Sequence, residues 1–145
     1  MTNHKQKGQT LLELIISIGV VVFVMLGLVV AVTSSLRFGQ ASRNRSRAVK
    51  YAQEAIELTR QYRDATLWET FQSNAGLLPT VWCLNKSGTW SVQGGNACEL
   101  IDNLFSRNVS LTWQDPIVRV QVDVSWPQGN TVLHSQLETY LTDWK

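Results

Sequence analysis

Glu13 stands at the start of a long apolar segment and is the first acidic residue of the chain. The run from Leu14 to Leu36 contains no charged residue and no proline. Burying a carboxylate in hydrocarbon is energetically costly. The cost is smaller near the membrane interface, where the dipole at the start of a helix also favours a negative charge. It is also smaller where a cation lies beside the carboxylate. Two uses of Glu13 therefore stay open: a solvated group on a single membrane anchor, or one half of an ion pair inside a bundle of helices.

Cys83 and Cys98 are the second pair of reactive side chains, and both lie far beyond the apolar run. No CxxC or Cys/His spacing typical of a metal site is present, so we predict no metal. A disulfide between the two cysteines would stabilise the fold by about 3 kcal/mol and would place this part of the chain in an oxidising compartment. We favour the disulfide, with two buried free thiols as the alternative.

The other polar residues form no recognisable catalytic pattern. His134 is the one histidine beyond the leader, and we expect it on an exposed or edge face of a hairpin. There is no glycine-rich phosphate loop and no nucleophile elbow, so we predict no enzyme, no catalytic residue and no cofactor. The candidate acids occur singly, without the pairing that acid–base catalysis uses: Asp115, Asp123, Glu138 and Asp143.

A basic cluster follows the apolar run and consists of Arg37, Arg43, Arg45, Arg47 and Lys50. No aromatic residues interleave with the arginines, which disfavours a nucleic-acid groove. A solvated helix face or attraction to anionic lipid head groups fits better. By the positive-inside rule alone, this cluster favours a cytoplasmic location for the C-terminal domain. The expected disulfide favours the opposite, extracytoplasmic side of the membrane. We predict the extracytoplasmic location.

Long helical segments must position these groups. The residues from Leu14 to Leu36 would span about 34 Å as an α-helix, enough to cross the hydrocarbon core of a bilayer. An amphipathic stripe follows at helical spacing, formed by Tyr51, Ala55, Leu58 and Tyr62. Only Gly39 weakens the helix between the two stretches. We therefore predict one helix from about residue 10 to about residue 70.

The C-terminal part reads as an antiparallel sheet. Over Val118–Trp126, valines on one face alternate with polar residues on the other, and Pro127–Asn130 forms a turn. The chain returns over Thr131–Leu141, with Leu133, Leu137 and Leu141 expected on the buried side. Shorter strands are predicted near Val81–Leu84, Thr89–Val92 and Val109–Trp113. Because the apolar face of the hairpin needs a cover and the helical stripe offers one, the sequence predicts an α+β fold.

The segment from Gly8 to Ile16 resembles the prepilin N-terminus of type IV pilins and type II secretion pseudopilins. A short basic leader ends in Gly8, a glutamate follows five residues later, and an apolar helix begins there. The resemblance implies a pilin-like fold, in which the long helix packs on the sheet. It also implies that a prepilin peptidase cuts between Gly8 and Gln9 and methylates Gln9. Glu13 would then pair with the free amine of Gln9 on a neighbouring subunit.

Two features differ from the usual pattern of these proteins. Phenylalanine is common where Gln9 stands, and major pilins commonly link cysteines near the C-terminus, whereas Cys83 and Cys98 precede the main hairpin. Both differences favour a minor subunit over a major one.

The resemblance implies four segments. They are a leader over residues 1–8, an apolar transmembrane and assembly helix over 9–36, its amphipathic continuation over 37–72, and a β-rich domain over 73–145. The expected partners are a prepilin peptidase, other pilin or pseudopilin subunits, an inner-membrane assembly platform and membrane lipid. The expected location is the inner membrane in a single pass, then a surface or periplasmic filament.

The alternative function is a membrane-anchored or secreted extracytoplasmic binding or adhesion domain that does not assemble. Four of the six tryptophans, Trp82, Trp90, Trp113 and Trp126, lie in or beside the predicted strands, where core filling is their expected use. A carbohydrate or adhesion platform is the other use that tryptophans could serve.

Overall fold

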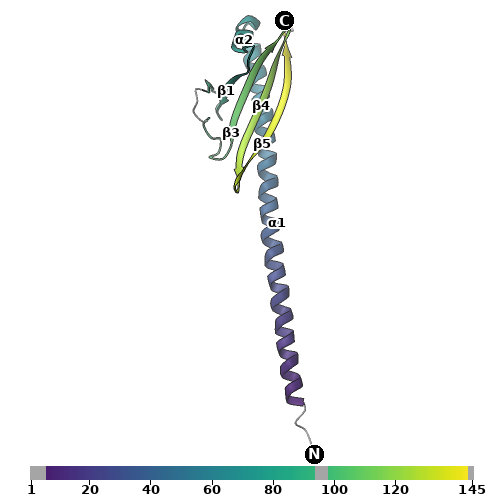
Figure 1. The fold of residues 1–145 in the computed structure, drawn as a ribbon. Coiled ribbons are helices and arrows are strands. Elements are labelled where there is room, and N and C mark those ends of the chain that lie inside the picture. Colours follow the sequence, from purple (N-terminus) through teal and green to yellow (C-terminus); the bar gives the residue numbers. More distant parts are fainter. Residues whose placement is uncertain (1–5, 94–97, 144–145) are drawn as a thin grey trace, which may run out of the picture. The chain divides into compact units, whose positions relative to one another are not determined.

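The computed structural model describes residues 6–93 and 98–143, with side chains from Leu11 onward. A long helix is followed by a short one and five strands, which confirms the predicted α+β fold (Figure 1). The elements are α1 (Gln6–Ala65), α2 (Trp68–Asn74), β1 (Thr80–Leu84), β2 (Trp90–Val92), β3 (Ser106–Gln114), β4 (Ile117–Gln128) and β5 (Thr131–Thr142).

The chain divides into two compact units, Met1–Ser42 and Arg43–Lys145, and α1 contributes residues to both. The described part of the first unit is helical throughout. Each large apolar side chain from Leu11 to Phe38 exposes at least 50% of its surface. By length and composition alone, α1 qualifies as a membrane-crossing helix.

The second unit contains an antiparallel sheet with the strand order β2-β1-β3-β4-β5. The predicted alternation in β4 is confirmed, because every second side chain from Val118 to Trp126 is buried. Gly129 lies in the predicted turn between β4 and β5 with φ +63°. This left-handed backbone conformation is one that glycine adopts without steric cost.

Small side chains on α1 contribute to the core of the second unit. Ala48, Ala52, Ala55 and Thr59 recur at helical spacing and are fully buried in the same core as the β4 valines. The buried hydroxyl of Thr59 donates a hydrogen bond to the Ala55 carbonyl oxygen at 2.7 Å, so it is not left unpaired. The predicted stripe is thereby confirmed, with alanines at its centre and larger side chains partly buried around them: Tyr51, Ile56, Leu58 and Tyr62.

The first helix ends at Ala65, earlier than the predicted end near residue 70. Leu67 is extended, with φ −68° and ψ 142°, and α2 begins at the next residue. Thr66 satisfies the last turn of α1 by donating its hydroxyl to the Tyr62 carbonyl oxygen at 2.9 Å. The break lets α2 bury Phe71 completely in the core, a gain that helical periodicity alone does not reveal.

The expected burial of β5 is right at one end and wrong at the other. Leu141 is 4% exposed and Leu137 packs partly buried against the core, whereas Leu133 is 38% exposed. Leu133 pairs with Trp126 near the turn. Because β5 is an edge strand, it has a neighbouring strand on one side only. Its inward-facing side chains are buried at the C-terminal end of the strand and become exposed toward the turn.

Candidate assembly segment

Glu13 lies on α1 among apolar side chains that are all exposed. Its own side chain is exposed, and Leu12 and Leu14 beside it are 62% and 60% exposed. The carboxylate of Glu13 forms no ion pair or hydrogen bond with any described side chain, whereas its backbone oxygen accepts a hydrogen bond from the Ser17 hydroxyl at 2.7 Å. The charge at this position is therefore available to a group outside the described part of the chain.

The polar side chains within the apolar run bond back to their own helix. Thr33 donates its hydroxyl to the carbonyl oxygens of Val29 and Val30 at 2.9 and 3.0 Å. Such bonds satisfy hydroxyls in a surrounding that lacks water. The helix also continues through Gly19 and Gly27, where an added Cβ would meet no atom within 4 Å. Neither glycine is needed for packing within the described chain.

Gly8 and Gln9, the predicted cleavage and methylation residues, both lie in the first turn of α1. They precede Leu11, where the described side chains begin, so nothing is assigned to the Gln9 side chain. Their roles therefore remain predictions.

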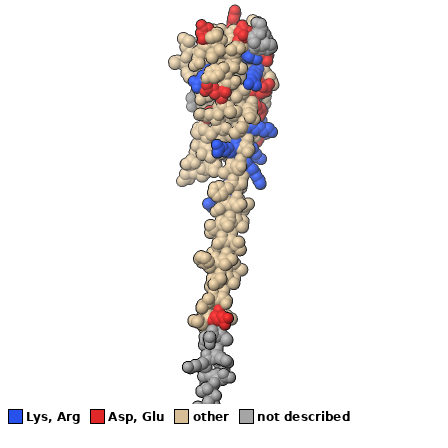
Figure 2. All heavy atoms as spheres, turned by 90° about the vertical axis from the view of Figure 1, so that its right-hand side faces the viewer, with Lys and Arg blue, Asp and Glu red and all other residues tan. Residues whose placement is uncertain are grey.

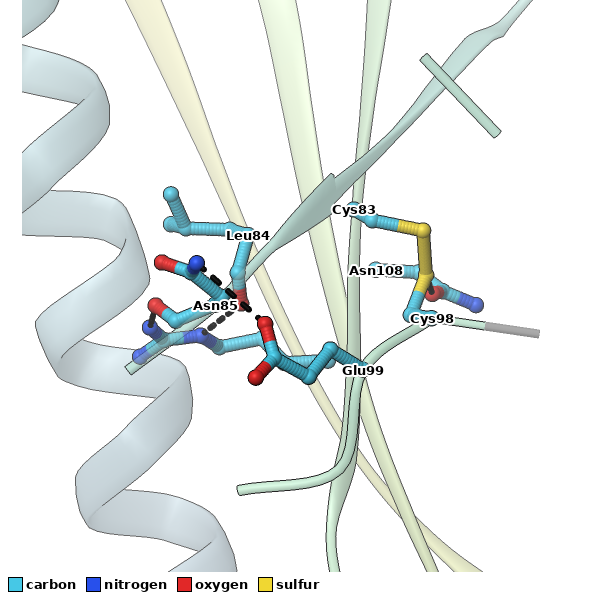
Figure 3. Close-up of a disulfide and its surroundings, with 7 residues drawn as sticks. Cys83, Leu84, Asn85, Cys98, Glu99 and Asn108 are labelled. Carbon is cyan, nitrogen blue, oxygen red and sulfur yellow. Dashed lines mark hydrogen bonds between the residues drawn. A yellow bond between two sulfur atoms is a disulfide. The ribbon is translucent and has the colours of Figure 1, made fainter. Parts of the chain in front are cut away.

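Cys83 and Cys98 form the disulfide that the sequence predicted (Figure 3). Cys83 is in β1, Cys98 follows β2, and their Cα atoms are 5.3 Å apart. A second contact lies nearby, because the Asn85 side-chain amide donates to the Glu99 carboxylate at 3.3 Å. The two links fasten the segment after β2 to the end of β1.

Reduction of the disulfide is expected to lower the free energy of unfolding by about 3 kcal/mol, because the unfolded chain regains the freedom of a closed loop. The measurement is urea unfolding of the full chain in detergent, followed by tryptophan fluorescence, with and without reductant. The control is the Cys83→Ala, Cys98→Ala double variant, whose unfolding midpoint should not respond to reductant. An equal response in both proteins would contradict the prediction.

Arg107 in β3 is a buried cation that the sequence prediction missed. Its side chain is completely buried and donates hydrogen bonds to three carbonyl oxygens. Nε reaches Leu84 at 3.0 Å and Nη2 reaches Asn85 at 2.5 Å, both at the end of β1. Nη1 reaches the Tyr51 carbonyl oxygen on α1 at 3.1 Å. The planar fork of the guanidinium thereby connects α1, β1 and β3.

The charge of Arg107 is only partly compensated. Burial lowers the pKa of the guanidinium, and the nearby Glu54 carboxylate, whose oxygen is 3.6 Å from Nη1, acts in the opposite direction. A signal for this residue exists in the sequence, since Arg107 shares its strand face with Val109 and Leu111 at a period of two. The prediction began this strand at Val109 and so placed the arginine outside it.

A surface cluster of Tyr51, Lys86 and Asp102 adds a second connection between α1 and the loops. Asp102 lies in a turn with φ 50°, accepts a hydrogen bond from the Tyr51 hydroxyl, and is 2.6 Å from Lys86 Nζ. The ammonium of Lys86, and then the Tyr51 hydroxyl, lower the pKa of Asp102. The same contacts raise the pKa values of Lys86 and Tyr51. Exposed pairs of this kind contribute little to stability.

Two of the four candidate acids, Asp123 and Glu138, each contact a basic side chain on the β4–β5 hairpin. His134 is exposed on the edge strand β5, as predicted, with Nδ1 3.0 Å from Asp123 Oδ2. On the same hairpin, Arg119 donates to Glu138 at 2.6 Å and lowers the pKa of that carboxyl. Within residues 11–93 and 98–143, no group of three or more His, Cys, Asp or Glu side chains could hold a metal ion.

The tryptophans of the sheet fill the core, as predicted. Trp126 is 2% exposed, and three others pack partly buried against the core: Trp82, Trp90 and Trp113. Trp68 joins them, whereas Trp144 lies outside the described residues. A cavity of about 50 Å³ lies beside Trp82 and Trp90. This volume is far below the roughly 300–1,000 Å³ of typical ligand pockets.

Comparison with known proteins identifies the N-terminal segment. Residues 3–29 match the family model of the prokaryotic N-terminal methylation motif, a span that contains Gly8, Gln9 and Glu13. No curated protein and no solved structure matches the chain. The apolar helix and the motif together fit single-pass anchoring in the inner membrane. The chain therefore carries, at its N-terminus, the prepilin-type signature of type IV pilins and pseudopilins.

Proposed function

We propose that this protein is a structural subunit, a minor pilin or pseudopilin, that assembles through α1 into a type IV pilus or a type II secretion pseudopilus. The methylation motif at residues 3–29 is the observation that carries the proposal. The exposed apolar surface of the first unit supports it, because a helix without a partner in its own chain can pack against lipid before assembly and against other helices afterwards.

Maturation begins with removal of residues 1–8 between Gly8 and Gln9 by a prepilin peptidase, which then methylates Gln9. Cleavage gives the chain a new amine four residues before Glu13. In a bundle of helices without water, an unpaired carboxylate is costly, so a neighbouring Gln9 amine is its natural partner. The absence of a described partner for Glu13 is consistent with this role.

Residues 73–145, together with residues 37–72, which include the amphipathic part of α1, form the part that projects outside the inner membrane. The disulfide supports this orientation, since such bonds persist in oxidising compartments. The other partners are an inner-membrane assembly platform and neighbouring subunits, and the final location is a surface or periplasmic filament.

Processing is tested by measuring the N-terminus of the mature protein in cells that contain the peptidase. We expect it at Gln9, with one added methyl group, and we expect Gly8→Val to abolish cleavage because the residue at the scissile bond becomes bulky and branched. Gly19→Ala is the matched control, since a Cβ at position 19 meets nothing within 4 Å, and it should be processed normally. A mature N-terminus near Ser34 would instead indicate an ordinary secreted protein. Labelling of sheared filaments with an antibody against residues 98–143 then tests assembly.

A further inference from the structure

Three basic residues share one exposed face of α1 in the second unit. Arg43, Arg47 and Lys50 follow the spacing i, i+4, i+7, which places them on one side of a helix. The buried alanine at position 52 lies on the opposite side of the helix. All three side chains are exposed. Figure 2 shows several blue Lys and Arg side chains at one end of this unit and others farther along it. We call these three residues the cationic face.

The cationic face differs from the basic residues beyond Lys50 in forming no ion pair with a described side chain. Among the described side chains, the remaining cations beyond Lys50 each form an ion pair: Arg60, Arg63, Lys86, Arg107 and Arg119. The three residues of the cationic face form no ion pair or hydrogen bond with a described side chain, and neither do Arg37 and Arg45. The sequence contains no Asp or Glu from Leu14 to Gln53. This stretch of α1 is therefore positive, and Asp102, whose pKa Arg47 helps to lower, is a nearby carboxylate that offsets part of the charge.

The position of the cationic face along the helix points to a membrane surface. Arg43 follows Leu36, the last residue of the apolar run, by seven residues, which is about 10 Å in an α-helix. Helical side chains tilt toward the N-terminus, so Arg43 and Arg47 extend back toward the apolar run. Attraction to an anionic surface fades over a screening length of about 8 Å at physiological salt. The attraction should therefore be strongest at Arg43 and weakest at Lys50.

We propose that the cationic face binds the head groups of anionic phospholipids on the side of the membrane where the second unit lies. The chemistry fits, because guanidinium groups bind phosphate oxygens in pairs and neither Arg43 nor Arg47 forms an ion pair with a described carboxylate. This contact holds the unassembled subunit at the bilayer surface until it leaves the membrane. The inference uses from the proposed function only that α1 spans the membrane.

The test measures lipid selectivity in phosphatidylcholine vesicles that contain the full chain. Spin-labelled phosphatidylglycerol or spin-labelled phosphatidylcholine is added, and the motionally restricted fraction of each label reports its association with the protein. Beside the basic residues we expect a roughly fivefold preference for phosphatidylglycerol over phosphatidylcholine. Because the measurement averages over all lipids that neighbour the protein, the observed preference should be about twofold. The preference should disappear between about 0.01 M and about 1 M NaCl, as the screening length falls from about 30 Å to about 3 Å.

Two double variants decide the matter. Arg43→Gln with Arg47→Gln should remove most of the preference. Arg60→Gln with Arg119→Gln, which removes the same charge outside the cationic face, should retain it. A preference that persists in the first variant overturns the proposal and assigns the effect to other basic residues, such as Arg37, Arg45 or the leader lysines. Equal association of the two lipids with the unmodified chain also overturns it, and leaves an acidic protein surface as the partner to seek. Extraction of the chain by alkaline carbonate, a sign that α1 does not span the bilayer, contradicts both this inference and the proposed function.

Discussion

Replacement of Glu13 by alanine is expected to leave cleavage after Gly8 intact and to abolish incorporation of the subunit into filaments. The carboxylate has no partner among the described side chains, so its removal costs the isolated chain nothing. In the assembled bundle, by contrast, the amine of a neighbouring Gln9 loses its counter-charge. An uncompensated buried charge costs about 3–5 kcal/mol, which is about a hundredfold to several thousandfold in the association constant.

The measurement compares the amount of subunit in sheared filaments with the amount that remains in the membrane. Ser17→Ala is the matched control, because it lies one turn away and loses only a hydrogen bond within its own helix. That variant should be incorporated at the normal level. Normal incorporation of the Glu13→Ala protein would remove the proposed role of Glu13, even if processing at Gly8 proved correct.

Replacement of Arg107 by alanine is expected to lower the free energy of unfolding by about 3–5 kcal/mol. The change removes three hydrogen bonds from a charged donor, to the carbonyl oxygens of Leu84, Asn85 and Tyr51, and leaves a cavity in a fully buried site. Arg107→Lys should recover only part of the lost free energy of unfolding. The ammonium of a lysine does not reproduce the planar guanidinium that donates to three carbonyl oxygens at once.

Urea unfolding of the full chain in detergent, followed by tryptophan fluorescence, gives the comparison. Arg119→Ala is the control. Arg119 lies on β4, next to the strand of Arg107, and also pairs with a glutamate, Glu138 on β5, but both side chains are about one third exposed. We expect that change to cost less than about 1 kcal/mol. Equal losses in the Arg107→Ala and Arg119→Ala proteins would show that burial of Arg107 does not set its contribution.

The regular elements were predictable because their signals are local. The apolar run specifies a helix wherever water is absent, and the alternating valines of β4 specify a strand with one buried face. The Cys83–Cys98 disulfide was also predicted, helped by the absence of any other cysteine. The processing segment is equally local, since Gly8, Gln9 and Glu13 lie within six residues of one another.

A prepilin-type N-terminus, a long helix and an antiparallel hairpin could thus be derived from the order of the residues alone. The end of α1 at Ala65, the exposure of Leu133 and the burial of Arg107 became apparent only in the folded chain. Each of these features depends on contacts between residues that are distant in the sequence. The end of α1 depends on the packing of Phe71 in the core, and the exposure of Leu133 depends on what covers β5. The burial of Arg107 depends on the carbonyl groups of Tyr51, Leu84 and Asn85. A period of two or of 3.6 identifies the face of an element, but the depth of burial on that face is set by the element that packs against it.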